Sequence, residues 1–299
     1  MSCTELDSRG DGQLMMEREI ARYFATGESD PLGKSSPGNH TFERLTNYEH
    51  YLREALIQEV QRRERGRRLQ YMPERFDPVT WTRRKVEPMI AGLFPAAERE
   101  LVLGVAERSI VFLTQEAAHQ AIRKTPFLSS ARTIANVYLH SLGAPTLGDE
   151  PRQIVGLNLE RECYVSMDYF ADKDPFADYV THEVAHVFHN CKRETVGLPY
   201  SHSREWLLEI SFARRETFAY ACEAYGRILE QAGRKQRRHS LLTQYARGPA
   251  PSDDRVEPTE LLDILAKAVD ALNGWKRILA RCSSRKYEPK MTLANPARL

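Results

Sequence analysis

Residues 182 to 186 read His-Glu-Val-Ala-His, and this pentapeptide constrains the fold of the chain more than any other segment. In an α-helix the side chains of His182 and His186 project from one face, with their Cβ atoms about 5–6 Å apart. Two imidazole nitrogens at that spacing can bind one metal ion at about 2.0–2.1 Å each. Glu183 follows the first histidine, where its carboxylate can meet a water molecule at the metal without being a ligand. The pentapeptide therefore predicts a helix with a catalytic metal site, and we expect an enzyme.

The sequence around the pentapeptide predicts one largely buried helix that begins at Asp174. Asp174 can cap this helix, Pro175 suits its first position, and Asp178 adds negative charge near its N-terminus. Apolar residues recur along the segment at Phe176, Val180, Val184, Val187 and Phe188. Because polar groups are costly to bury without partners, the histidines and the glutamate need partners in such a helix. A metal ion would satisfy them; the alternative is a core in which the histidines are only hydrogen-bonded.

The residues after His186 exclude one class of metallopeptidase. Metzincins have a glycine three residues and a histidine six residues beyond the second histidine, where this chain has His189 and Lys192. The ring of His189 would lie about one helical turn beyond the metal. We therefore expect His189 to support a ligand or to pack beside it, and the third ligand to come from another segment.

A second helix, predicted over residues 204–231, supplies carboxylates. Glu209, Glu216 and Glu223 are seven residues apart and so fall near one face of that helix. Carboxylates are rarely buried unless they bind or orient something positive. This helix is therefore the expected source of the third ligand.

The segment Glu216-Thr-Phe-Ala resembles the Glu-x-Phe-Ala signature at the third ligand of lethal-factor-like and Mlc-titration-factor-like zinc peptidases. These families are gluzincins, in which one helix carries two histidine ligands and a later helix carries a glutamate ligand. The resemblance, which covers only the two site helices, implies one catalytic Zn²⁺ bound by His182, His186 and Glu216. Glu183 would be the general base, and Glu223 is the alternative third ligand.

A zincin also needs a donor that stabilises negative charge on the substrate oxygen. The resembled families use a tyrosine seven residues before the glutamate ligand, where this chain has Glu209, so the role cannot be transferred by position. Tyr200 and His202 lie in the loop between the two ligand helices, where a wall of the cleft is expected. We predict that one of them fills this role. Tyr220, which follows on the ligand helix, is the alternative, either as a donor or as a packing residue.

Two extended runs, residues 153–159 and 162–170, precede the site helix. The second run can be an edge strand along which an extended peptide binds, or part of an interior hairpin that only packs the site helix. Elsewhere, apolar residues four apart predict an amphipathic helix over residues 47–70. Further helices are expected near 96–106, 115–124, 129–141 and 257–282, with a buried strand at 110–113.

These elements predict a predominantly helical α+β fold. We expect a zincin-like catalytic domain with a small mixed or antiparallel sheet packed on the helix of the pentapeptide. The predicted divisions are a flexible lead over residues 1–45, a helical region over 46–95, the metallopeptidase domain with C-terminal helices over 96–282, and a loose tail over 283–299.

Composition limits the partners and the compartment. The 43 basic and 41 acidic residues favour neither nucleic acid nor a membrane surface as a partner. The basic cluster at residues 62–68 is interpreted as a solvated helix end, with phosphate binding as the alternative. The sequence has no apolar run of about 18 residues and no signal peptide. The five cysteines form no CxxC pair, which is typical of a reducing compartment, so we expect a cytoplasmic protein, with leaderless export left open.

The predicted function is zinc-dependent hydrolysis of a peptide bond in a protein or peptide substrate. One alternative is a non-hydrolytic regulatory or binding protein with the zincin fold. The presence of Glu183 argues against a non-hydrolytic protein, because a site that has lost its catalytic activity does not need a general base. The other alternative is an amidase that uses the same zinc chemistry on a substrate other than protein.

Overall fold

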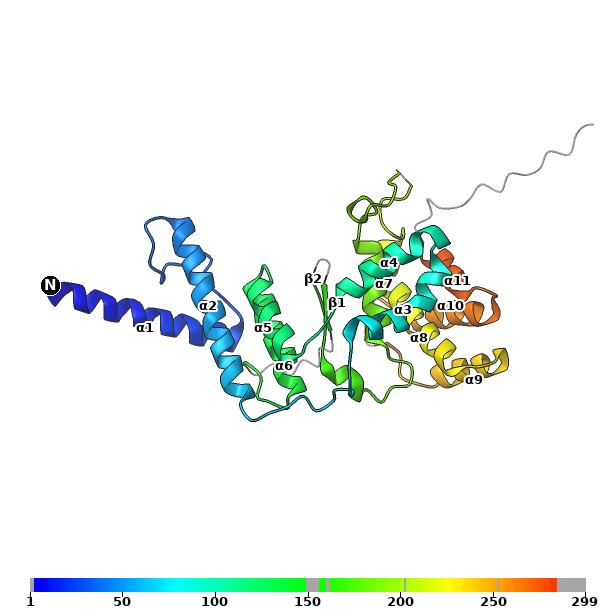
Figure 1. The fold of residues 1–299 in the computed structure, drawn as a ribbon, viewed down its shortest axis with the longest axis horizontal. Helices are drawn as coiled ribbons and strands as arrows, with labels where there is room; N and C mark the ends of the chain where they lie inside the picture. The colour runs from blue at the N-terminus through cyan, green and yellow to red at the C-terminus, as the bar shows by residue number, and fades with distance from the viewer. Residues whose placement is uncertain (1–2, 149–155, 160–161, 202, 252, 284–299) are drawn as a thin grey trace, which may run out of the picture. The chain divides into compact units, whose positions relative to one another are not determined.

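The computed structural model describes residues 3–148, 156–159, 162–201, 203–251 and 253–283 (Figure 1). The chain forms two compact units and passes between them more than once. The first unit comprises residues 1–76, 111–159 and 163–172, and the second comprises residues 77–110, 160–162 and 173–299. Among the described helices, none is both long and apolar enough to span a membrane. The fold is predominantly helical, as the sequence predicts.

The first unit is built on four helices: α1 (Cys3–Thr26), α2 (Thr41–Glu64), α5 (Gln115–Lys124) and α6 (Leu128–Ser141). Helix α6 packs against both α2 and α5. The apolar positions predicted from their four-residue spacing are all buried, namely Tyr48, Leu52, Leu56 and Val60. The amphipathic helix is thus confirmed, although it begins at Thr41, where His40 caps it by accepting a hydrogen bond from the backbone N–H of Glu43.

The N-terminal segment, for which composition predicts a flexible lead, contains a long helix. Helix α1 covers most of it, and Tyr23 on this helix is fully buried. The Tyr23 hydroxyl donates a hydrogen bond of 2.6 Å to the carbonyl oxygen of Leu128. The Tyr48 hydroxyl likewise donates to Glu19 at 2.8 Å. These long-range contacts anchor α1 to the core of the first unit.

The small sheet contains β1 (Ile110–Phe112), β2 (Gly156–Leu159) and β3 (Glu162–Val165) in the order β1-β3-β2. The prediction of antiparallel pairing is wrong for β1 and β3, which pair in parallel. Helices α5 and α6 lie between β1 and β3 in the chain and supply the long crossover that parallel strands require. Since β3 has a neighbour on each side, it is an interior strand, which rules out the substrate-binding edge of the two alternatives for this run. The 3₁₀-helix η1 (Met167–Ala171) follows β3.

The second unit is helical. Its elements are α3 (Pro78–Leu93), α4 (Ala96–Ser109), α7 (Tyr179–Asn190), η2 (Glu194–Val196), η3 (Phe212–Arg214), α8 (Arg215–Gln231), α9 (Lys235–Tyr245), α10 (Pro258–Asp270) and α11 (Gly274–Cys282). Helix α7, which carries the pentapeptide, packs against α8, α3 and α4. These helices are its main packing partners within the unit. Helices α3 and α4, which lie on either side of the predicted boundary at residue 95, belong to the same unit as α7.

Both site helices begin later than predicted. Asp174 closes a turn by accepting the backbone N–H of Phe176, and α7 starts only after Asp178, whose carboxylate accepts the N–H of Thr181. Helix α8 begins at Arg215, not near residue 204. The residues before it are held in irregular structure, with isolated bridges from Trp206 to Lys192 and from Ile210 to Ser283. The tail beyond residue 283 lies outside the described residues.

The single helix predicted over residues 257–282 is two helices, α10 and α11. Asn273 caps α11 by accepting the N–H of Lys276, and Leu272 in the break is fully exposed. The first residue of α11, Gly274, lies against Tyr225 of α8. A Cβ atom at Gly274 would lie 2.4 Å from the Tyr225 hydroxyl oxygen and 2.5 Å from the carbonyl oxygen of Ala268. The close approach of α11 to α8 therefore requires glycine here.

We expect Gly274→Ala to lower the free energy of unfolding by about 1–3 kcal/mol, because the added methyl group overpacks this contact. Urea denaturation of the purified protein measures the change. Gly233→Ala is the matched control, since a Cβ atom there meets nothing within 4 Å. Equal stability of the two variants would contradict the prediction.

Candidate metal centre

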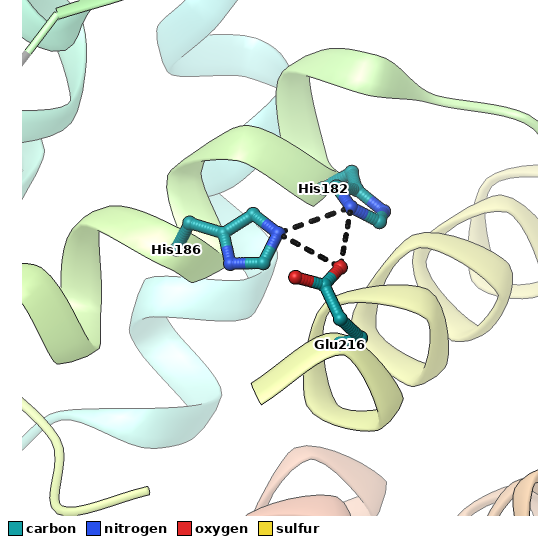
Figure 2. Close-up of side chains that lie close together, drawn as sticks. All are labelled: His182, His186 and Glu216. Carbon is teal, nitrogen blue, oxygen red and sulfur yellow. Dashed lines mark hydrogen bonds and ion pairs between the residues drawn. The ribbon is translucent and has the colours of Figure 1, made fainter. Parts of the chain in front are cut away.

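Three side chains from α7 and α8 converge on one point (Figure 2). His182 and His186 extend from α7, and Glu216 extends from the first turn of α8. Their ligand atoms lie within 4.8 Å of one another and form a group that could hold a metal ion. The packing of α7 on α8 brings Glu216 close to the two histidines. The four-residue spacing of the histidines places both of their rings on the same face of α7.

The distances within this group match the face of a tetrahedron. The Nε2 atoms of His182 and His186 are 3.2 Å apart. The Oε2 atom of Glu216 lies 3.8 Å from the first and 3.4 Å from the second. Four ligands at about 2.1 Å in tetrahedral geometry are spaced about 3.4 Å from one another. An ion in contact with all three atoms therefore needs little movement of the side chains.

Glu223 fixes the orientation of the first histidine. Its Oε2 atom lies 3.0 Å from Nδ1 of His182, and its Oε1 atom accepts the backbone N–H of Asp178 at 2.7 Å. A hydrogen bond from Nδ1–H to this carboxylate leaves the Nε2 lone pair directed at the group. Glu223, the alternative third ligand from the sequence, thus lies on the far side of the His182 ring and orients that ring instead.

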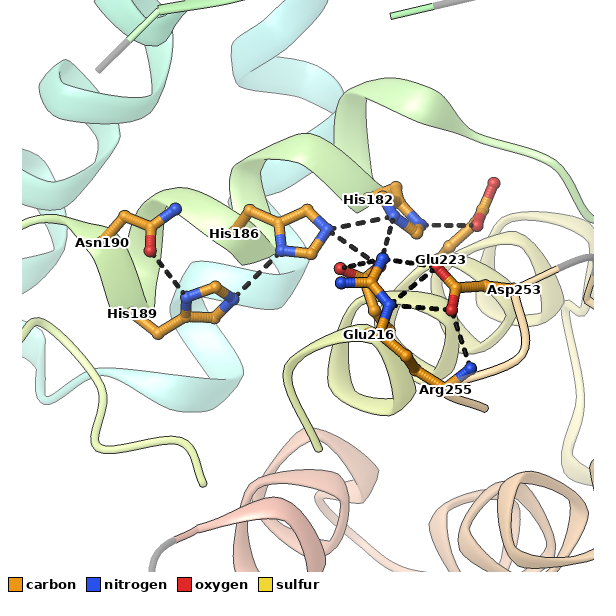
Figure 3. Close-up of polar contacts among 8 residues, drawn as sticks. All are labelled: His182, His186, His189, Asn190, Glu216, Glu223, Asp253 and Arg255. Carbon is orange, nitrogen blue, oxygen red and sulfur yellow. Dashed lines mark hydrogen bonds and ion pairs between the residues drawn. The ribbon is translucent and has the colours of Figure 1, made fainter. Parts of the chain in front are cut away.

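A second chain of hydrogen bonds orients His186 (Figure 3). Its Nδ1 atom lies 3.1 Å from Nε2 of His189, whose Nδ1 lies 3.1 Å from the side-chain oxygen of Asn190. Burial, aided by the charge of His186, lowers the pKa of His189 to about 3, so His189 is neutral at physiological pH. If His189 donates to Asn190, it accepts from Nδ1–H of His186, and the Nε2 lone pair of His186 faces the group. The expectation that His189 supports a ligand agrees with this geometry.

The group favours a positive charge at its centre. Burial lowers the pKa of His182, but the carboxylates of Glu216 and Glu223 outweigh burial and raise it to about 10. Burial raises the pKa of Glu216, but His182 and His186 outweigh it and hold it well below its usual range. A proton is thus retained among these side chains, and a metal ion would take its place.

The other oxygen of Glu216 is held by a residue that sequence reasoning missed. Arg255 places its Nη2 atom 3.1 Å from Oε1 of Glu216 (Figure 3). Asp253 holds the same guanidinium through contacts of 2.9 Å to Nε and 2.5 Å to Nη2. Glu216 therefore presents only Oε2 to the two histidines. An arginine 39 positions beyond its partner, outside any helical spacing, gave no signal in the sequence.

The remaining predicted site residues differ in their placement. Glu183 is buried on α7, and its negative charge acts on the adjacent His182. Tyr200 is half-exposed in the loop between η2 and η3. The ring of Tyr220 packs edge-on against that of His182, with centroids 4.6 Å apart, as the packing alternative anticipated. His202 lies outside the described residues. The roles of Glu183 and Tyr200 stay predictions.

Glu209 has a structural function. Its Oε1 atom accepts the backbone N–H groups of Glu205 and Trp206 at 2.7 and 2.9 Å. It thus closes the turn that precedes η3 and does not lie on α8 with Glu216 and Glu223.

We expect Glu223→Gln to weaken the affinity for a divalent ion such as Zn²⁺ by about 10–100-fold, the usual effect of removing a carboxylate that orients a histidine ligand. A neutral amide has one oxygen for two donors, the His182 ring and the Asp178 backbone N–H. Competition with a zinc-binding dye measures the affinity. Glu194→Gln, an exposed glutamate in the same unit, is the control. An unchanged affinity would show that Glu223 does not orient the ligand.

Comparison with protein-family models, curated proteins and solved structures finds no match for this chain. The arrangement of His182, His186 and Glu216 is therefore the basis for any statement about function.

Proposed function

We propose that the protein is a zinc-dependent peptidase, with His182, His186 and Glu216 as the ligands of one catalytic Zn²⁺. The observation that supports this proposal is the triangle of two Nε2 atoms and one carboxylate oxygen with edges of 3.2, 3.4 and 3.8 Å. Three protein ligands leave a fourth position open, as in catalytic zinc sites. Two histidines and one carboxylate also occur in non-haem iron sites, so the identity of the metal is part of the test.

In the proposed reaction, bound Zn²⁺ would lower the pKa of a water molecule in the open position and polarise the substrate carbonyl. Glu183 would accept a proton from the attacking water and pass it to the leaving amine. Its position next to His182 supports this role, since the two side chains leave the same turn of α7. Glu223 and His189 would keep both imidazoles aligned throughout the reaction.

The experiment that tests the proposal combines metal analysis with a cleavage assay. The protein is produced with zinc and iron both available, and its metals are measured by elemental mass spectrometry. It is then incubated with a proteome-derived peptide library, before and after chelation and after zinc is restored. We expect about one zinc per chain, cleavage that is lost on chelation, and recovery with zinc.

The other outcomes separate the alternatives. Protein without zinc, or with iron in its place, would overturn the proposal. Bound zinc without cleavage of any peptide would favour the amidase on a non-protein substrate or the non-hydrolytic binding protein. A screen of small amides would then distinguish these two.

A further inference from the structure

The guanidinium of Arg255 lies beside the metal group and is held there from two sides. Glu216 contacts its Nη2 atom, and Asp253 contacts Nη2 and Nε (Figure 3). Asp253 also accepts the backbone N–H of Arg255 at 2.9 Å, which closes a tight turn. The guanidinium is thus fixed in orientation, although 68% of the Arg255 side chain is exposed.

The hydrogen-bonding capacity of Arg255 is only partly used. An arginine side chain has five N–H donors. Nε–H and one N–H of Nη2 serve Asp253, and Nη2 also forms an ion pair with Glu216 at 3.1 Å. Within the part of the chain that the structure describes, Nη1 has no hydrogen-bond partner. Two donors of a cation that is held from two sides are thus left for a ligand beside Glu216.

The partners of Arg255 do not need it to hold the fold together. Glu216 is already paired with both histidines through Oε2, and Asp253 lies in a loop between α9 and α10. An aspartate that holds an exposed arginine beside Glu216 positions a fixed positive charge next to the metal group. Arginine is well suited to binding carboxylates, because its N–H groups are fixed in a plane and its charge is permanent.

We propose that Arg255 recognises a carboxylate of the ligand that binds at the metal group, through its Nη1 donors. This inference rests on the proposed function, and it names the substrate class as peptides with a carboxylate close to the scissile bond. That carboxylate is either the C-terminus of the peptide or the side chain of an aspartate or glutamate. Arg255 is a specificity-determining residue in both cases.

The test measures binding of peptides to zinc-loaded protein that carries Glu183→Gln, so that no turnover interferes. Isothermal titration compares four hexapeptides that differ only in a free or amidated C-terminus and in one internal glutamate or glutamine. Each is measured with Arg255 intact, with Arg255→Gln and with Arg255→Lys. Arg247→Gln is the matched control, because Arg247 is an exposed arginine of the same segment.

We expect Arg255→Gln to weaken binding of the carboxylate-bearing peptides about tenfold or more, as loss of a charge-assisted hydrogen bond does. Arg255→Lys should recover part of this loss, and Arg247→Gln should have no effect. Binding of the amidated peptide without glutamate should not change. Preference for the free C-terminus would identify the terminal carboxylate, and preference for the internal glutamate would identify a side chain.

Three results would overturn the inference. Arg255→Gln could weaken all four peptides equally, it could weaken none of them, or it could lose zinc. The last result would show that Arg255 acts only through Glu216. Failure of the peptidase proposal appears elsewhere, as missing zinc or missing cleavage in the protein with an intact Glu183. Carboxylate binding that depends on Arg255 would stand even if no peptide were cleaved.

Discussion

Glu183→Gln is expected to retain zinc and to lower kcat/KM for peptide cleavage by about 10²–10⁴-fold, the usual contribution of a general base. Glutamine has nearly the same shape as glutamate but cannot accept the proton of the attacking water. The metal should stay, because the three proposed ligands are His182, His186 and Glu216. Initial rates on a peptide identified in the library screen, together with zinc content, measure both effects.

Glu194→Gln is the matched control for this variant, since it removes the same charge from an exposed position. It should cleave like the unaltered protein. If Glu183→Gln also cleaved at the normal rate with zinc bound, Glu183 would not be the base. If it lost zinc, the residue would have a structural role on α7.

Glu216→Ala is expected to lower zinc affinity more than Glu223→Gln does, by well over 100-fold, because it removes a ligand and not a residue that orients one. Two histidines would remain to hold the ion. The released Arg255 would also lose one of its two carboxylate partners. Dye competition gives the affinity, and circular dichroism checks that the helices are retained.

The comparison of Glu216→Ala with Glu223→Gln decides which glutamate binds the metal. The geometry places Oε2 of Glu216 next to both Nε2 atoms and places Glu223 on the opposite nitrogen of His182. A larger loss of affinity in Glu223→Gln would reverse this assignment.

The parts of the site that depend on local spacing were predictable from the sequence. His182 and His186 are four residues apart on one helix, and helix geometry alone brings their rings together. Glu216 was selected by a four-residue resemblance, and the structure brings it to the same group. Glu216 and Glu223 are seven residues apart, so the sequence placed both on one helix face. The spacing did not indicate which of the two lies next to the histidines. The crossing of α7 over α8 makes that distinction, and it is a tertiary feature.

The parts that depend on long-range contacts were not predictable. Arg255 reaches Glu216 from a loop, with no periodicity to mark it.

Two helix ends were also misplaced. The start of α7 was misplaced by one turn because Asp174 and Asp178 are both good helix caps, and Asp174 closes a local turn instead of capping the helix. The break at Asn273 was missed because the apolar spacing continues through it.

In the sheet, too, the local element was predictable and its pairing was not. Strand β1 was predicted from its short apolar run, and its position in the chain is confirmed. Its parallel direction relative to β3 depends on the crossover through α5 and α6; both helices were predicted, but the pairing of β1 with β3 was not.

The packing of α3 on α4, α7, α8 and α11 has a consequence for biosynthesis. A ribosome releases α3 and α4 long before the helices that cover them, and much of the other unit is made in between. The apolar surfaces of α3 and α4 therefore stay exposed on the nascent chain until α7 and α8 have been synthesised. We expect a translation product that ends before α8 to bind chaperones or aggregate. A fragment over residues 96–282 should fail for the same reason, because it lacks the helix around which its own site is assembled.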